Sequence, residues 1–291
     1  MTCANAAIPT RWSLNSITVP YLELPELLES ATKHGYQGIG LWRDHFDDYA
    51  AAEVAARVAE SGLRVSSLCR AGLFTHEDPA QRARAIDDSL LAVDQAAALR
   101  AAAVVVVPGG LVARDLVGSR SMVRDGLGRL AEYAASRGVS LALEPMHPML
   151  VEARSCITTV GEALDVLDEL GMHEHGIALD SYHVWWDAGI DNLTDRLKGR
   201  IHCVQIADWI DPDNGPTTSR GIPGEGCIDF GAFLSLAARL QYTGDIEVEV
   251  LSERWWERGA RKTLQSLDAA LTALHPAAGP WTGQHSASGA H

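Results

Sequence analysis

The sequence predicts a closed (β/α)8 barrel, also called a TIM barrel, in the α/β class. Short runs rich in aliphatic residues alternate eight times with longer segments of helical periodicity, which is typical of parallel strands joined by helices. Eight such units favour a closed barrel. An open doubly wound sheet is the less favoured alternative, because no G-x-G-x-x-G turn follows the first predicted strand.

Each predicted strand is a short aliphatic run bounded by polar or glycine-containing turns. The strands are expected at residues 12–18, 38–43, 64–68, 103–107, 140–144, 176–180, 201–207 and 246–251. The segments between them are rich in alanine, leucine, arginine and glutamate and are expected to form helices at residues 24–34, 49–61, 79–99, 121–137, 160–170, 193–198, 230–240 and 260–274. Glycines near several helix ends can adopt the left-handed conformation that ends many helices: Gly35, Gly62, Gly138, Gly171, Gly199 and Gly244.

One catalytic domain is expected, at residues 11–275. Barrels of about 250 residues are often single domains, so the length of the chain does not require a second one. Residues 1–10 and the small, polar, glycine-rich segment 276–291 are expected to be flexible ends that carry no chemistry.

Composition disfavours several classes of function. With 24 lysines and arginines against 38 acidic residues, the formal charge of -14 would repel a nucleic-acid backbone. Only three lysines occur, all in predicted helices or helix ends, which disfavours Schiff-base chemistry. The five cysteines are widely spaced, and no apolar run is long enough to span a bilayer. We therefore expect a cytoplasmic protein with neither a nucleic-acid partner nor a membrane partner.

Four predicted strands, the fifth to the eighth, direct polar side chains into the barrel. Side chains alternate along a strand, so the large aliphatic residues reveal which positions face the helices. The opposite positions near the carboxyl ends of these strands are occupied by Glu144, Asp180, Gln205 and Glu249. Glu247 also points inward but lies deeper, where it would support the site. Active sites of barrel enzymes lie at this carboxyl end.

Three inward carboxylates in one narrow barrel repel each other unless a cation neutralises them. A single divalent metal is the simplest such cation. Because Glu144, Asp180, Gln205 and Glu249 offer only oxygen ligands, they favour hard ions such as Mn²⁺ or Mg²⁺ over zinc. Each acid alone could instead be a loop cap or an ion-pair partner, and Gln205 could be a buried hydrogen-bonding amide.

Five motifs resemble those of the xylose-isomerase-like superfamily, whose (β/α)8 barrels include sugar isomerases, epimerases and dehydratases. They are LALEPMHP, ALDSYHVWWD, VQIADW, RGIPGEGCID and IEVEVLS, within a resemblance that covers residues 12–274. The resemblance implies that Glu144, Asp180, Gln205 and Glu249 bind one divalent metal, with Mn²⁺ expected, Mg²⁺ or Co²⁺ as alternatives, and no nucleotide cofactor. Many members have histidine where this chain has Gln205, whereas a subset that includes keto-acid dehydratases resembles this chain.

The chemistry that these residues and the resemblance imply is transfer of a proton next to a carbonyl. In such enzymes the metal stabilises the enediolate that forms when the proton leaves. Glu144 and Glu249 lie on the fifth and eighth strands, where they would reach opposite faces of a bound sugar, as an epimerase requires. His183 is expected to polarise or protonate a substrate oxygen.

Four further residues are expected to bind substrate. Arg220, on a loop after the seventh strand, can pair with an oxyanion, and the resemblance places both Arg220 and His183 at substrate oxygens. His147 in the EPMHP motif is a candidate contact. Trp185 and Trp209, with other tryptophans of the carboxyl-side loops, would form an apolar wall or a subunit interface. Arg220 could instead be solvated, and His183 could simply pack against a tryptophan.

The function expected from the sequence is a metal-dependent isomerase or epimerase of a small sugar or keto-sugar. The alternative is a lyase on the same scaffold, such as an inosose or dehydroshikimate dehydratase, or a C-glycoside deglycosidase subunit that acts on 3-keto glycosides by β-elimination. The chain is expected to act as a homo-oligomer or with a second subunit. A DNA-repair endonuclease is disfavoured by the acidic charge, and a non-catalytic subunit by the intact acids on four strands.

Overall fold

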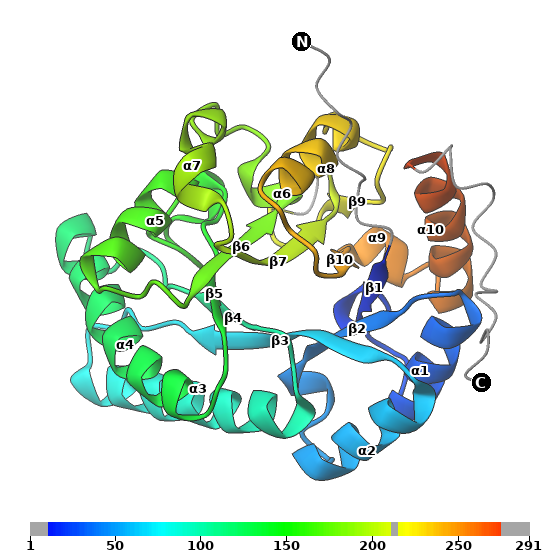
Figure 1. Cartoon of the computed structure of the whole chain (residues 1–291), viewed down its shortest axis with the longest axis horizontal. Helices are drawn as coiled ribbons and strands as arrows, with labels where there is room; N and C mark the ends of the chain where they lie inside the picture. Colours follow the sequence, from blue (N-terminus) through cyan, green and yellow to red (C-terminus); the bar gives the residue numbers. More distant parts are fainter. Residues whose placement is uncertain (1–10, 211–214, 275–291) are drawn as a thin grey trace.

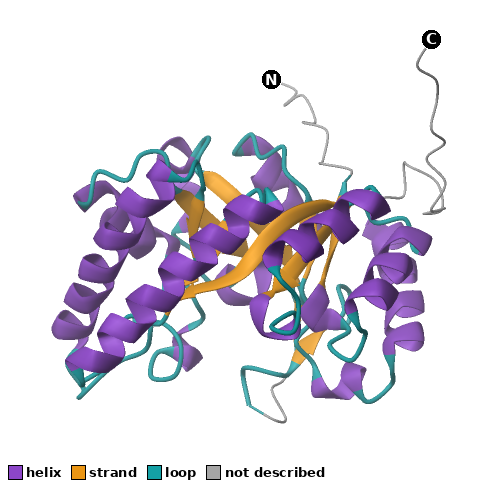
Figure 2. Cartoon of the chain, turned by 90° about the horizontal axis from the view of Figure 1, so that it is seen from below, coloured by secondary structure: helices purple, strands orange, loops and turns teal. Residues whose placement is uncertain are grey.

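The computed structural model describes residues 11–210 and 215–274 and confirms the closed barrel. Eight parallel strands follow one another in the order β1-β10-β7-β6-β5-β4-β3-β2, so the first strand pairs with the last barrel strand. The helices surround these strands (Figure 1 and Figure 2). The expectations for residues 1–10 and 276–291 lie outside the described residues. No helix in the described part of the chain is long and apolar enough to cross a membrane.

The barrel strands match the predicted runs, with ends that differ by a few residues. They are β1 (Trp12–Asn15), β2 (Gly38–Trp42), β3 (Arg64–Gly72), β4 (Val104–Val107), β5 (Leu141–Leu143), β6 (Gly176–Asp180), β7 (Ile201–Ile206) and β10 (Ile246–Val248). The first strand ends early because the Asn15 side chain accepts a hydrogen bond from the backbone N–H of Ile17, which starts a 3-10 helix. A separate antiparallel pair, β8 (Asp208–Trp209) and β9 (Arg220–Gly221), was not among the predicted strands.

Helices lie close to the eight predicted segments. They are α1 (Leu24–Lys33), α2 (Ala51–Ser61), α3 (Pro79–Leu99), α4 (Leu116–Ser136), α5 (Val160–Glu169), α7 (Thr194–Leu197), α8 (Phe230–Arg239) and α10 (Ala260–Leu274). The structure adds the short helices α6 (Ser181–Val184) and α9 (Glu253–Trp256) and the 3-10 turns η1 (Ser16–Thr18), η2 (Arg43–His45), η3 (Pro148–Leu150) and η4 (Ile190–Leu193). Helix α4 begins before the predicted start because Asp115 accepts a hydrogen bond from the backbone N–H of Gly118 at 2.9 Å.

The glycine at the end of α8 is an exception to the predicted helix caps. The other five predicted glycines have a positive φ, whereas Gly244 does not. Gln241 takes the left-handed conformation there, with φ of 61°. Gly244 is instead required by space, because an added Cβ would lie 2.3 Å from the hydroxyl oxygen of Tyr242.

Most buried apolar residues of the described chain fall into two layers, as the strand alternation predicts. Aliphatic residues on the outward positions, such as Leu179 and Val204, belong to the large cluster between strands and helices. The inward positions form a second cluster of small side chains inside the barrel: Cys69, Ala103, Val105, Ala142, Ala178 and Cys203. The inward positions that follow along β5, β6 and β7 are Glu144, Asp180 and Gln205, so a polar layer succeeds the apolar one.

Glu247 anchors the floor of this polar layer. It is fully buried and accepts hydrogen bonds from Asn15, Ser66, Ser67 and Gln205. Its carboxylate occupies the space beside a glycine of β2, since a Cβ added at Gly40 would lie 2.4 Å from its carboxyl carbon. The sequence predicts that Glu247 lies deeper than the other acids and supports the site. Its hydrogen bonds from uncharged side chains agree with such a supporting position.

Candidate active site

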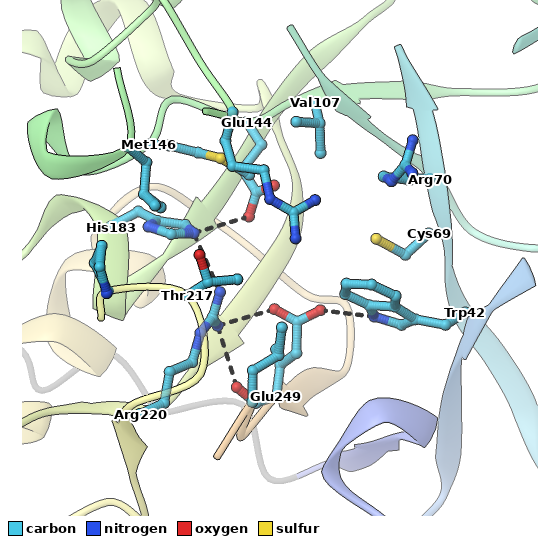
Figure 3. A pocket seen from close by; sticks show the side chains of 14 residues that line it. Trp42, Cys69, Arg70, Val107, Glu144, Met146, His183, Thr217, Arg220 and Glu249 are labelled. Atoms are coloured by element: carbon cyan, nitrogen blue, oxygen red, sulfur yellow. Dashed lines mark hydrogen bonds and ion pairs between the residues drawn. The ribbon is translucent and has the colours of Figure 1, made fainter. Parts of the chain in front are cut away.

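A pocket opens at the carboxyl ends of the barrel strands and encloses about 400 Å³ of empty space, its open mouth included. Glu144, which follows β5, and Glu249, which follows β10, are buried and line it (Figure 3). His183 and Arg220 line the same pocket. The structure therefore brings together four of the residues that the sequence analysis assigned to catalysis or binding.

Asp180, the last residue of β6, fixes the start of α6. Its Oδ1 accepts a hydrogen bond from the backbone N–H of Tyr182 at 2.9 Å, and the helix that begins there carries His183. His183 Nε2 lies 3.8 Å from Glu144 Oε1 and 3.7 Å from Asp180 Oδ2. Ligand atoms of Glu144, Asp180 and His183 all lie within 4.8 Å of one another, so these three side chains could share one metal ion.

Arg220 has a different environment from the predicted one. It lies in β9 rather than on a solvated loop, and only 4% of its surface is exposed. Its Nη1 donates to Asp180 Oδ2 at 2.7 Å. The same nitrogen donates to Glu249 Oε2 at 2.9 Å, and Nη2 lies 3.1 Å from His183 Nε2 (Figure 3). The guanidinium is thus the internal counter-ion of two carboxylates, because the barrel buries all of these groups together.

Asp208 holds the segment that follows Arg220 in place. It lies in β8, and its carboxylate accepts hydrogen bonds from the backbone N–H groups of Gly224 at 2.8 Å, Gly226 at 2.8 Å and Ile228 at 3.1 Å. A carboxylate that accepts several backbone hydrogen bonds orders the loop that supplies them. This role of Asp208 could not be predicted from the sequence, because hydrogen bonds to a later loop leave no periodic pattern.

Burial raises the pKa of the three carboxyl groups around Arg220. For Glu144, desolvation is the largest cause and repulsion from Glu249 and Asp180 adds to it, so its pKa lies well above the ordinary value. Desolvation also raises the pKa of Glu249 to about 8 and that of Asp180, although Arg220 opposes the rise in both. Arg220 alone therefore does not balance the three carboxyl groups that surround it.

His183 is neutral in this arrangement. Burial, followed by the charge of Arg220, holds the pKa of its imidazole well below the ordinary value. Because a guanidinium can only donate, His183 Nε2 acts as the acceptor for Arg220 Nη2. The backbone N–H of His147 lies 3.4 Å from Nδ1, on the other side of the ring.

Gln205 carries an amide oxygen that suits a cation. It lies beside Asp180 on the neighbouring strand β7, and its Nε2 donates to Glu247 Oε1 at 3.1 Å. Its Oε1 is buried and has no hydrogen-bond partner among the described residues. A buried oxygen without a donor is unfavourable unless an electropositive group meets it. Together with the three carboxyl groups around Arg220, this oxygen fits a hard divalent cation.

His147, Trp185 and Trp209 lie beside the pocket rather than in its lining. The rings of His147 and Trp209 stack with their centroids 4.3 Å apart, and those of Trp185 and Trp209 are 5.7 Å apart. Trp185 is 40% exposed, so this aromatic cluster reaches the surface. Contact of these three residues with substrate stays a prediction.

Several lining residues were not predicted from the sequence, and among them are Trp42, Arg70 and Arg154. Trp42 Nε1 donates to Glu249 Oε1 at 3.1 Å (Figure 3). Trp42 is the last residue of β2. Because Ile39 faces the helices, alternation along the strand directs Trp42 into the barrel, so its position in the pocket could have been predicted from the sequence. Arg154 lies in the irregular segment after β5, where periodicity gives no orientation.

Comparison with known proteins identifies the family. A family model described as xylose isomerase-like TIM barrel matches residues 28–270. The chain belongs to this family. A crystal structure of a protein from Sinorhizobium meliloti 1021 is similar to this member of the family, with a TM-score of 0.86, 35% identity, and coverage of 91% of this chain and 98% of that one. The crystal structure of the IolI protein with a bound zinc atom shares the fold, with a TM-score of 0.78, 21% identity and coverage of 91% and 98%.

Curated relatives of this family member are enzymes. The inosose isomerase of Bacillus velezensis is 23% identical over 266 residues, which cover 86% of this chain and 91% of the relative. The 3-dehydroshikimate dehydratase of Pseudomonas aeruginosa is 25% identical over 260 residues, which cover 87% of this chain. The matched region is 39% of that dehydratase, so the chain spans less than half of its length. The predicted resemblance to isomerases and dehydratases is confirmed.

Proposed function

We propose that the chain is a divalent-metal-dependent isomerase or epimerase that moves a proton next to the carbonyl of a sugar or keto-sugar. The observation that carries this proposal is the pair of buried acids with raised pKa, Glu144 and Glu249, that face one pocket. In the barrel, β7 and β6 separate the strands that these acids follow, so the two carboxyl groups approach a bound molecule from different sides. An acid whose pKa is raised can hold a proton or release it near neutral pH, so it can pass a proton in either direction.

The side chains of the pocket suggest a division of labour. One of the two acids, Glu144 or Glu249, accepts the proton from the carbon next to the carbonyl, and the other returns a proton to the opposite face. Arg220 turns from the carboxylates to donate to the substrate oxygen that becomes negative. His183, which is then free of the arginine, accepts a hydrogen bond from a substrate hydroxyl at Nε2. Apolar lining residues such as Met146 keep water from the reacting carbon.

Four oxygen-bearing side chains are proposed to hold one divalent cation, with Mn²⁺ preferred: Glu144, Asp180, Gln205 and Glu249. The partnerless Gln205 oxygen and the three buried acids around Arg220 support this assignment. When bound, the cation would supply Lewis-acid stabilisation of negative charge on substrate oxygens. The proximity of His183 Nε2 to Glu144 and Asp180 widens the choice to metals that also accept imidazole. The zinc atom bound to the IolI protein is in line with a divalent ion.

Exchange of substrate protons with solvent deuterium tests the proposal. The chain is loaded with Mn²⁺ and incubated in deuterated water with inososes and ketoses, and NMR follows the carbon next to the carbonyl. We expect label there, and a rate lower by about 10²–10⁴-fold in Glu144→Gln and in Glu249→Gln. Glu132→Gln, on an exposed position of α4, serves as the matched control. Absence of exchange with every ketose and keto-inositol would contradict the proposal.

A lyase is the second candidate, favoured by the similarity to the 3-dehydroshikimate dehydratase across most of this chain. The same first proton transfer would be followed by loss of a group from the next carbon, with the second acid donating a proton to it. Loss of water from an inosose or from dehydroshikimate, or β-elimination of a 3-keto glycoside with or without a second subunit, would give a conjugated product. A new ultraviolet absorption would favour the lyase, whereas deuterium exchange without such a product favours the isomerase.

A further inference from the structure

Two arginines line the active-site pocket, and neither is hydrogen-bonded or ion-paired to an acid among the described residues. Arg70 lies near the carboxyl end of β3, Arg154 lies between β5 and α5, and both are partly buried. Within the described residues, neither guanidinium has a hydrogen bond or an ion pair. Figure 3 shows Arg70 across the pocket from His183. The pocket therefore holds two guanidinium groups that its own acids leave without a hydrogen bond.

Neighbouring arginines show what a paired guanidinium looks like in this barrel. Arg220 is held by two carboxylates, and Arg43 pairs with Asp88 at 2.8 Å. The charge of Arg154 is nevertheless felt at the reacting groups, because it lowers the pKa of both Glu144 and His183. Arg154 thus lies close to Glu144 and His183 but forms no hydrogen bond or ion pair with either of them.

A partly buried guanidinium is best satisfied by a planar or tetrahedral anion that accepts parallel hydrogen bonds. Carboxylates and phosphates are such anions. The hydroxyl groups of a neutral sugar can accept single hydrogen bonds, but they do not compensate a full positive charge. Two free guanidinium groups on the wall of a substrate pocket are therefore complementary to a charged substrate.

We propose that Arg70 and Arg154 bind an anionic group of the substrate, a carboxylate or a phosphate, so that the enzyme acts on a sugar acid or a sugar phosphate. The inference rests on the proposed function for the reaction that follows binding, whereas the anion contact is a property of binding alone. The competing explanation is that the two arginines only offset the acidic floor of the pocket. In that case their removal would weaken charged and neutral ligands equally.

Three sugars that differ in one substituent separate these explanations. D-Fructose, D-fructuronate and D-fructose 6-phosphate carry a hydroxyl, a carboxylate and a phosphate at the same carbon. Titration calorimetry with and without Mn²⁺ gives the affinity of each for the wild-type chain, for Arg70→Gln and for Arg154→Gln. Arg129→Gln, at an exposed position of α4, controls for the loss of one positive charge.

We expect at least one anionic sugar to bind about ten-fold or more tightly than D-fructose. Each pocket substitution should remove most of that preference and change the affinity for D-fructose by less than about two-fold. Preference for D-fructuronate alone assigns a carboxylate, and preference for D-fructose 6-phosphate alone assigns a phosphate. Equal affinity for all three sugars, or a preference that survives both substitutions, would overturn the inference.

Deuterium exchange distinguishes this inference from the proposed function. Tight binding that depends on Arg70 and Arg154 without any exchange would leave the anion contact standing and remove the isomerase. Exchange together with equal affinity for neutral and anionic sugars would leave the isomerase standing and remove the anion contact.

Discussion

Replacement of Arg220 by glutamine removes the cation that lies between Asp180 and Glu249. Its Nη1 is 2.7 Å and 2.9 Å from the two carboxylates, and all three side chains are buried. Removing one partner of a buried ion pair costs about 3–5 kcal/mol, because the remaining charge is left uncompensated. The pKa of Glu249, raised to about 8, allows this acid to take up a proton instead. We therefore expect the free energy of unfolding to fall by about 3 kcal/mol, the lower end of that range, in metal-free protein.

Urea unfolding at neutral pH in the presence of a chelator measures this loss. Arg220→Lys, which keeps the charge, is the matched control and should lose less. Saturating Mn²⁺ should reduce the difference between wild type and Arg220→Gln, because a second cation then compensates the same acids. In an Asp180→Asn background the substitution should also cost less, since one of the two charges is already absent. A loss below about 1 kcal/mol in metal-free protein would refute the role of Arg220 as counter-ion.

Three further outcomes can be checked with the same unfolding assay. Metal-free protein should become less stable as the pH rises from about 5 to 8. Folded Glu249 has the raised pKa, so in this window the native state holds a proton that the unfolded chain has lost. A urea midpoint that rises with pH over this window would contradict the prediction. Gly40→Ala should lower the free energy of unfolding by about 1–3 kcal/mol, because the added methyl group displaces the carboxylate of Glu247. Gly128→Ala in α4 is the control: the nearest atom to the added Cβ lies at 4.0 Å, so this change should raise the free energy of unfolding by about 0.5–1 kcal/mol. Equal effects of the two substitutions would argue against the close approach at Gly40. Asp208→Asn should lower the free energy of unfolding by about 2–3 kcal/mol, because the oxygen that accepts from the backbone N–H groups of Gly224 and Gly226 is replaced by an amide donor. An unchanged urea midpoint would show that the loop does not depend on these hydrogen bonds.

The barrel and the floor of its site could be predicted because both rest on a pattern of period two. In β6, Ile177 and Leu179 face the helices, so Asp180 faces the inside of the barrel. This holds whichever strand lies next to β6. The same rule gives Glu144 and Gln205. Alternation is a local property of the chain, so it can be read without knowledge of the strands that will become neighbours.

The environment of Arg220 could not be predicted in the same way. Its partners Asp180 and Glu249 are 40 and 29 residues away in the sequence, and they meet it only because the fold places β9 beside the carboxyl ends of β6 and β10. The position of β9 depends in turn on Asp208, through hydrogen bonds to a later loop. By contrast, the early start of α4 had a readable signal in Asp115, which is a helix-capping residue type.

Glu249 ties the chemistry of the pocket to the joint where the ring of strands closes. Asn15 of β1 and Trp42 of β2 both donate to Glu249 Oε1 at 3.1 Å, across 234 and 207 residues of sequence. Contacts of such long sequence separation form late, because a large loop must first be ordered. During refolding, recovery of proton exchange should therefore lag behind recovery of helix content and follow the joining of the first and last strands.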